Sequence, residues 1–362
     1  KYQDSHRRFL GHTKGVPTFA LAKKSNLLIS GSHDKTVRFF NRKDNSQLAQ
    51  ITGFTGNVNA VVLGPDEKIL FTGADMGELA VWDISDVSIG GEPKKIKSLT
   101  GHSKDVLCLA ISPNSKYLAS AGADEKVLIW DVTSLEQVHT LEGHAGNIRC
   151  LDFSPDGSTL ASISHDNYLI LWSLNSGEEK QRIKVTKEDH QLGLAVSFHP
   201  DGESIATGNS HGEVRSIRVE DGKIISKFIV PMQWIRSLDF SDDGRVLAVA
   251  GNDPFIRLLR INTRYNLKPW HAIPGHSQQT WQVEFGNSKK HLYSSGTDNS
   301  SAARKLPNLG LDTERKFSNK IDSIERILRR LWFCKIYNKI LLAGNRSFQL
   351  YYPNDRQCAM VL

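Results

Sequence analysis

The sequence has few cysteines and no long hydrophobic run, and both deficits restrict the class of protein. Only four of the 362 residues are cysteines, Cys108, Cys150, Cys334 and Cys358, and none forms a Cys-x-x-Cys pair. These counts argue against a disulfide scaffold. No apolar stretch approaches the roughly 18 residues that a membrane span needs. We therefore expect an intracellular protein, cytoplasmic or nuclear, with reduced thiols and no membrane span.

Motifs for catalysis and for cofactor binding are missing as well. The chain has no Gly-rich phosphate loop, no paired Cys/His metal spacing and no His-Glu-x-x-His segment. We therefore expect no cofactor, no metal ion and no small-molecule substrate.

Most of the chain also lacks an excess of either charge. The formal net charge is +7, but residues 301–362 hold 12 Lys/Arg against 5 Asp/Glu, which leaves 34 of each kind in residues 1–300. A dedicated nucleic-acid-binding domain is expected to be basic more evenly. Nucleic acid is therefore only an alternative partner, and it would bind through residues 301–362.

What the sequence does contain is an internal repeat. Gly-His pairs occur at 11–12, 101–102, 143–144 and 275–276, and an aspartate follows each His after 22 residues: Asp34, Asp124, Asp166 and Asp298. Between His and Asp lie two alternating apolar runs, split by a turn such as Ser154-Pro155-Asp156-Gly157. Each unit thus reads as strand, turn, strand, tight turn, strand.

These residues resemble the WD-repeat family along nearly the whole chain. Trp-Asp dipeptides occur at 82–83 and 130–131, and Trp130 and Trp172 each follow a repeat aspartate by six residues. The resemblance implies an all-β fold, a single β-propeller in which each unit of about 40–45 residues supplies four antiparallel strands to a blade. It also implies that residues 1–10 provide the strand that closes the ring.

We count eight repeat units, with seven blades as the alternative. Seven units occupy residues 11–317, and residues 318–362 are either a diverged eighth unit or a flanking basic segment. Within that last part, residues 339–352 pass as two strands around Gly344-Asn345. Residues 318–332 have apolar residues at helical spacing, but we favour an outer strand with solvated arginines over a basic amphipathic helix.

The resemblance further implies a buried hydrogen-bond tetrad of His, Ser, Asp and Trp. Phe40 and Arg304 take the Trp place in units one and seven, and Gly122 takes the Ser place in unit three. A Ser-His-Asp trio could suggest a hydrolase, but this one recurs with the repeat and is expected to be structural. The predicted members are His12, Ser32, Asp34, His102, Asp124, Trp130, His144, Ser164, Asp166, Trp172, His276 and Asp298.

A second set of candidates is expected to bind partners. In the family, the third and fifth positions after the opening His face the top surface, and Trp and Arg are enriched at binding hot spots. The alternative is that the tryptophans pack inward between blades. The candidates are Trp234, Arg236, Trp281, Arg149, Leu107, His33 and His165.

The sequence thus favours a non-catalytic protein–protein interaction scaffold that binds other proteins on the propeller faces within a multi-subunit complex. One alternative is an RNA-binding or other nucleic-acid-binding propeller in a ribonucleoprotein, which would use the basic C-terminal part. Another is an enzyme that uses the central channel. An enzyme should show perturbed acids and bases that do not recur with the repeat, and the sequence reveals no such cluster.

Overall fold

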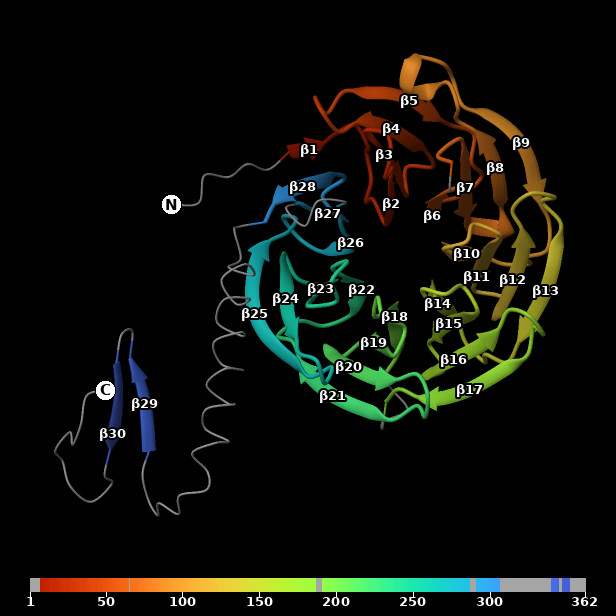
Figure 1. Cartoon of the computed structure of the whole chain (residues 1–362). Helices are drawn as coiled ribbons and strands as arrows, with labels where there is room; N and C mark the ends of the chain where they lie inside the picture. Colours follow the sequence, from red (N-terminus) through yellow and green to blue (C-terminus); the bar gives the residue numbers. More distant parts are fainter. Residues whose placement is uncertain are drawn as a thin grey trace. The chain divides into compact units, whose positions relative to one another are not determined.

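The computed structural model contains seven four-stranded antiparallel sheets arranged as blades around a central channel (Figure 1). It describes residues 7–64, 66–186, 191–286, 291–306, 340–344 and 347–351. The chain divides into two units, residues 1–306 and 307–362, and the first unit holds all seven blades. The predicted all-β propeller with four-stranded blades is therefore confirmed.

The first strand of each blade lies nearest the channel (Figure 1). Within its own sheet it has a neighbour on one edge only, so its other edge is left for contacts with the next blade. The inner strands are β2 (Thr18–Leu21), β6 (Val58–Leu63), β10 (Val106–Ile111), β14 (Ile148–Phe153), β18 (Gly193–Phe198), β22 (Ile235–Phe240) and β26 (Thr280–Phe285).

The second and third strands form the core of each blade. They read as nearly continuous apolar runs, because neighbouring blades cover both faces of the sheet. All six residues of β15 are buried, for example. The second strands are β3 (Leu27–Gly31), β7 (Ile69–Ala74), β11 (Tyr117–Gly122), β15 (Thr159–Ser164), β19 (Ser204–Asn209), β23 (Val246–Gly251) and β27 (His291–Gly296). The third strands are β4 (Val37–Asn41), β8 (Leu79–Asp83), β12 (Lys126–Asp131), β16 (Tyr168–Ser173), β20 (Glu213–Arg218), β24 (Phe255–Ile261) and β28 (Ser301–Lys305).

The fourth strands form the rim, and they are mostly polar because solvent covers one side of them. Two short 3-10 turns, η1 (Asp75–Gly77) and η2 (Val87–Ile89), belong to the second blade. The rim strands are β5 (Gln47–Ile51), β9 (Lys94–Leu99), β13 (Gln137–Glu142), β17 (Glu179–Lys184), β21 (Ile224–Ile229), β25 (Leu267–Pro274) and β1 (Arg7–Phe9).

The seventh blade joins the two ends of the ring. Strand β1 pairs antiparallel with β28, with Arg7 opposite Ala303 and Phe9 opposite Ser301. The N-terminal strand therefore supplies the fourth strand of a blade whose other three strands come from residues 280–305. Because this blade needs nothing from later residues, the count of eight blades is wrong and the propeller has seven.

The second unit contains one described hairpin, β29 (Ile340–Gly344) paired antiparallel with β30 (Ser347–Tyr351). These strands form a two-stranded sheet of their own rather than an eighth blade. Residues 318–332, for which the sequence allows an outer strand or a basic helix, lie outside the described residues, as does much of the basic part at 301–362.

Strand direction defines two faces of the ring. Strands alternate in direction, so the loops that enter the inner strands share one end with the turns that join second to third strands. We call this end the top face. Turns that join third to fourth strands lie at the other end, the bottom face.

Candidate functional site

A hydrogen-bonded network is buried under the top loop of the fourth blade. His144 contacts the Asp166 carboxylate through Nδ1 at 2.7 Å and the Ser162 hydroxyl through Nε2 at 2.8 Å. The indole Nε1 of Trp172 donates to the same hydroxyl at 2.8 Å. Each polar side chain therefore has a partner despite its burial, which is the condition for keeping polar groups inside a protein.

The serine of this network is not the predicted Ser164. Ser164 Oγ instead donates to the Gly146 carbonyl and accepts from the Asp166 N–H. The two serines lie two residues apart and so point to the same face of strand β15, but only Ser162 lies within reach of Trp172. The same correction applies to Ser32, which bonds to the Lys14 and Gly15 carbonyls.

Three other blades carry versions of the network. In the third blade His102 meets Ser120 and Asp124, and Trp130 donates to Ser120, so that set is complete and Gly122 is not its serine position. The first blade joins His12 to Ser30 and Asp34, with Phe40 in the tryptophan place. The seventh joins His276 to Ser294 and Asp298, and there the Arg304 guanidinium donates to Ser294 and to the Gly275 carbonyl.

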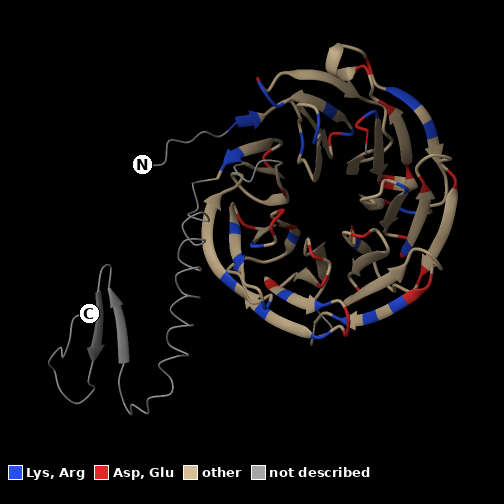
Figure 2. Cartoon of the chain, in the orientation of Figure 1, with Lys and Arg blue, Asp and Glu red and all other residues tan. Residues whose placement is uncertain are grey.

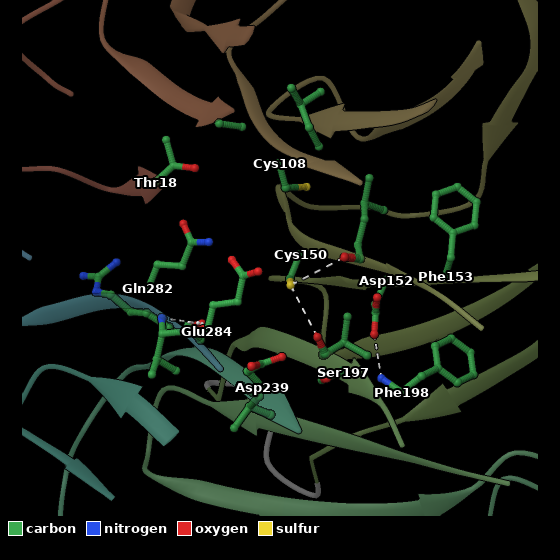
Figure 3. A pocket seen from close by; sticks show the side chains of 18 of the residues that line it. Thr18, Cys108, Cys150, Asp152, Phe153, Ser197, Phe198, Asp239, Gln282 and Glu284 are labelled. Atoms are coloured by element: carbon green, nitrogen blue, oxygen red, sulfur yellow. Dashed lines mark hydrogen bonds between the residues drawn. The ribbon is translucent and has the colours of Figure 1, made fainter. Parts of the chain in front are cut away.

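Side chains of one inner strand bond to the backbone of the next inner strand around the channel (Figure 3). Gln282 bonds to both the N–H and the carbonyl of Phe19, and Ser237 bonds to the backbone of Val283. The Cys150 thiol lies 3.6 Å from the Val196 carbonyl. These contacts satisfy the free edges of the inner strands and lock neighbouring blades together.

Three carboxyl groups belong to this channel wall. Asp152 accepts the Phe198 N–H at 2.6 Å, and Asp239 accepts the Phe285 N–H at 2.6 Å. Burial raises the pKa of Asp152 and of Glu284 to about 7. Burial also raises the pKa of Asp239 well above its usual value, and the neighbouring charge of Glu284 adds to this effect.

The sequence motifs did not identify these acids, although the positions of the acids within the repeat could have. Asp152 and Glu284 both lie eight residues after the opening His of their repeats, and Asp239 matches Asp152 in strand register. The perturbed acids therefore recur with the blade period. Two of them bond to backbone N–H groups of the following blade. This arrangement supports a structural role rather than acid–base catalysis.

We expect Asp152→Asn and Glu284→Gln to stabilise the protein at pH 8 and to change its stability little at pH 3. A carboxyl with a raised folded-state pKa contributes stability that is fully present below the unfolded value of about 4. That contribution is lost as pH rises through about 7. The expected gain at pH 8 is at least about 1.4 kcal/mol for each variant, as measured by urea unfolding.

Asp156→Asn is the matched control for that comparison. A hydrogen bond from Ser154, followed by bonds from Ser158, lowers the pKa of Asp156, so its removal should not stabilise the protein at pH 8. Equal stability of Asp152→Asn and the wild type at pH 8 would contradict the burial of a charged carboxylate in the channel.

The inner strands contain a β-bulge near their top ends that sequence patterns did not reveal. In the fourth blade Ile148 pairs with Ser164 and Cys150 with Ile163, which leaves Arg149 without a partner residue. A bulge leaves one residue unpaired and re-aims its side chain. The bulged residues of six blades are Asn59, Leu107, Arg149, Leu194, Arg236 and Trp281.

The two tryptophans predicted to bind partners lie on either side of Arg236, near the top ends of the inner strands. The Arg236 Cζ atom lies 5.6 Å from the Trp234 ring centroid and 5.7 Å from that of Trp281. Arg236 Nε donates to the Asn252 side-chain oxygen at 2.8 Å. Both indole rings are half-buried, so neither belongs to the solvent-free core and each keeps an accessible surface.

The other predicted partner-binding residues lie around the same channel mouth. The His33 ring lies 5.0 Å from that of Trp281. Burial lowers the pKa of His165 to about 4, and the charge of Arg149 lowers it further. Leu107 lines a cavity of about 570 Å³ together with Arg236 and Trp281. We call the seven predicted residues the top patch: Trp234, Arg236, Trp281, Arg149, Leu107, His33 and His165.

Two other kinds of functional feature are absent from the described residues. They contain no cluster of three or more His, Cys, Asp or Glu side chains placed to hold a metal ion. In the same part of the chain, no helix is long and apolar enough to cross a membrane.

Comparison with known families gives two matches. Residues 90–303 match the family model described as the IFT122 first β-propeller, and residues 3–41 match the WD domain, G-beta repeat. The first match covers more than half of the chain. No curated protein matches the sequence. WD40 propeller families are generally non-catalytic, and their members are typically protein-interaction scaffolds in complexes.

Proposed function

The chain belongs to the IFT122 first β-propeller family, and from this we propose that it is a non-catalytic scaffold that binds partner proteins through its top patch. The observation that carries the proposal is the stack of Arg236 with Trp234 and Trp281. Aromatic and arginine side chains at the centre of an interface supply most of its binding energy.

The backbone at Trp234 supports a binding role. Its φ of 52° lies in the left-handed region, where a bulky side chain is rare and costs free energy. Such conformations persist where the surrounding structure imposes them, and they cluster at ligand-binding sites. The β-bulges at Arg236 and Trp281 direct these two side chains to the same part of the channel mouth. A rigid ring can therefore offer this patch in one fixed geometry, which limits the entropy lost on binding.

The family indicates the assembly in which the scaffold works. We infer that the chain is a subunit of an IFT complex and acts in the cilium or the cytoplasm. The carboxyl groups of the channel recur with the blade period, which supports a structural role for them and a scaffold without enzymatic activity. Around the ring, acidic and basic residues are interspersed (Figure 2), which gives little support to nucleic-acid binding by the propeller faces.

Replacing both Trp234 and Trp281 by alanine should abolish recovery of the complex. The two rings supply the contact area of the patch, and hot-spot truncations cost about 2 kcal/mol or more each in binding. Because both rings are half-buried, the free energy of unfolding should fall by less than about 2 kcal/mol. Affinity purification of the tagged full chain from cells tests the first point, and chemical denaturation tests the second.

Trp270→Ala provides the matched control. Trp270 lies on the rim strand β25 and also stacks against an arginine, with the Arg260 Cζ atom 4.4 Å from its ring centroid. This variant should retain the complex. If Trp234→Ala with Trp281→Ala keeps the complex at the wild-type level, the top patch is not the binding surface.

A further inference from the structure

Two arginines at the channel mouth lack an acidic partner. Among the six bulged residues, only Arg149 and Arg236 are charged, and both are half-buried. Within the described part of the chain, neither forms an ion pair with a carboxylate. The only side-chain hydrogen bond of Arg236 there goes to the neutral amide of Asn252.

Two other partly buried arginines of the ring pair with carboxylates. Arg215 contacts Glu213 at 2.9 Å, and Arg257 contacts Asp253 at 2.8 Å. Withdrawing a cation from water without such a partner is costly. Arg149 and Arg236 have no such carboxylate partner among the described residues, and Arg149 has no hydrogen-bond partner there that would replace one.

The two guanidinium groups also repel each other. Burial lowers the pKa of Arg236 to about 10, and the charge of Arg149 lowers it further. Burial likewise lowers the pKa of Arg149. An anion bound by both groups would offset the cost of their desolvation and their repulsion, which favours a negatively charged ligand at this site.

We propose that Arg149 and Arg236 bind a carboxylate from an acidic segment of a partner protein, at the mouth of the channel beside Trp234 and Trp281. Guanidinium groups match carboxylates in geometry and can donate two parallel hydrogen bonds to them. The indole rings hold Arg236 in place and offer apolar surface to the rest of the segment. This inference rests on the proposed function, because it assigns a ligand chemistry to the top patch.

The surroundings favour a carboxylate on a peptide over a nucleic acid. Nucleic-acid binding draws on many phosphate contacts spread over a basic surface, whereas here the charged bulge residues are only two arginines, one of which, Arg236, borders a cavity of about 570 Å³. The same cavity is lined by Asp152, Asp239 and Glu284. Above about pH 7, where Asp152 and Glu284 carry charge, a chain of phosphates that enters the cavity would meet these acids, whereas a carboxylate bound at the mouth would not.

Binding of a defined peptide tests the proposal. The probes are a fluorescent peptide rich in glutamate, the same peptide with glutamine in place of glutamate, and a single-stranded RNA of equal length. At low ionic strength the wild-type chain should bind the glutamate peptide at least tenfold more tightly than the glutamine peptide. Arg149→Gln and Arg236→Gln should each weaken glutamate binding at least fivefold. Arg264→Gln, an exposed site in the bottom-face turn between β24 and β25, should not.

Equal binding of the two peptides would overturn the proposal, as would glutamate binding that survives both arginine replacements. RNA binding that depends on Arg149 and Arg236 and exceeds that of the glutamate peptide would overturn it in favour of nucleic acid. Thermal unfolding without ligand provides a second readout. Arg149→Gln removes one of two unpaired charges and should raise the unfolding temperature by a few degrees, whereas a structural role for Arg149 predicts a lower one.

A parallel purification separates this inference from the proposed function. If the Trp234 and Trp281 variant loses the complex while the Arg149 and Arg236 variant keeps it, the top patch binds partners but not through a carboxylate. If both variants keep the complex, the proposed function fails. Peptide binding that depends on the arginines would in that case still show that the site binds carboxylates.

Discussion

Replacing Phe9 by alanine should lower the free energy of unfolding by about 3–5 kcal/mol, the usual cost of truncating a fully buried phenylalanine. Only 1% of Phe9 is exposed, and its ring lies 5.6 Å from that of Phe40 in a cluster that includes Tyr293. That cluster joins the first blade to the seventh. The variant therefore loosens the junction at which the ring closes.

Deleting residues 1–10 should have a still larger effect. Without β1, strand β28 would become an unprotected edge with one neighbour instead of two. The deletion also removes the Arg7 side chain, which donates to the Arg42 and Lys43 carbonyls of the first blade. We expect a markedly lower unfolding temperature and a greater tendency to aggregate, measured by thermal unfolding with light scattering.

Leu10→Ala is the control for both changes. Leu10 follows Phe9 directly but is 63% exposed, so its truncation should cost less than about 0.5 kcal/mol. Unfolding of the Phe9→Ala variant at the wild-type denaturant midpoint would show that β1 does not hold the ring closed.

Repeated spacing proved informative where one geometry recurs in every blade. The interval of 22 residues between His144 and Asp166 recurs in three other units, and in all four the structure brings the two side chains into contact. Spacing could not select the serine, because residues two apart share a face of the strand. That choice depends on the cross-strand position of the tryptophan.

The blade count and the bulges depend on features that local sequence does not encode. Whether the ring closes with seven blades is decided by the pairing of β1 with β28, two segments almost 300 residues apart in the chain. The bulge positions hold residues as different as Asn59, Leu107 and Trp281. No residue type marks them, since a bulge follows from the register of two strands rather than from a side-chain preference.

Replacing His144 by alanine should lower the free energy of unfolding by about 3 kcal/mol, because it leaves two buried groups, the Asp166 carboxylate and the Ser162 hydroxyl, without this partner. Burial alone would raise the pKa of Asp166. The bond from His144, together with others, outweighs it and keeps that pKa low. This stabilisation is present above the unfolded pKa of about 4 and is lost as pH falls through the folded value. The cost of the substitution should therefore be larger at pH 7 than at pH 3.

Trp172→Phe provides a graded comparison within the same network. It removes the indole N–H that bonds to Ser162 and part of the buried ring, and it introduces the residue type that the first blade has at Phe40. We expect a cost of about 2 kcal/mol, less than for His144→Ala. His271→Ala, at an exposed position on β25, should be neutral. Urea unfolding of the three variants at pH 7 decides the matter: if His144→Ala costs no more than His271→Ala, the network does not stabilise the blade.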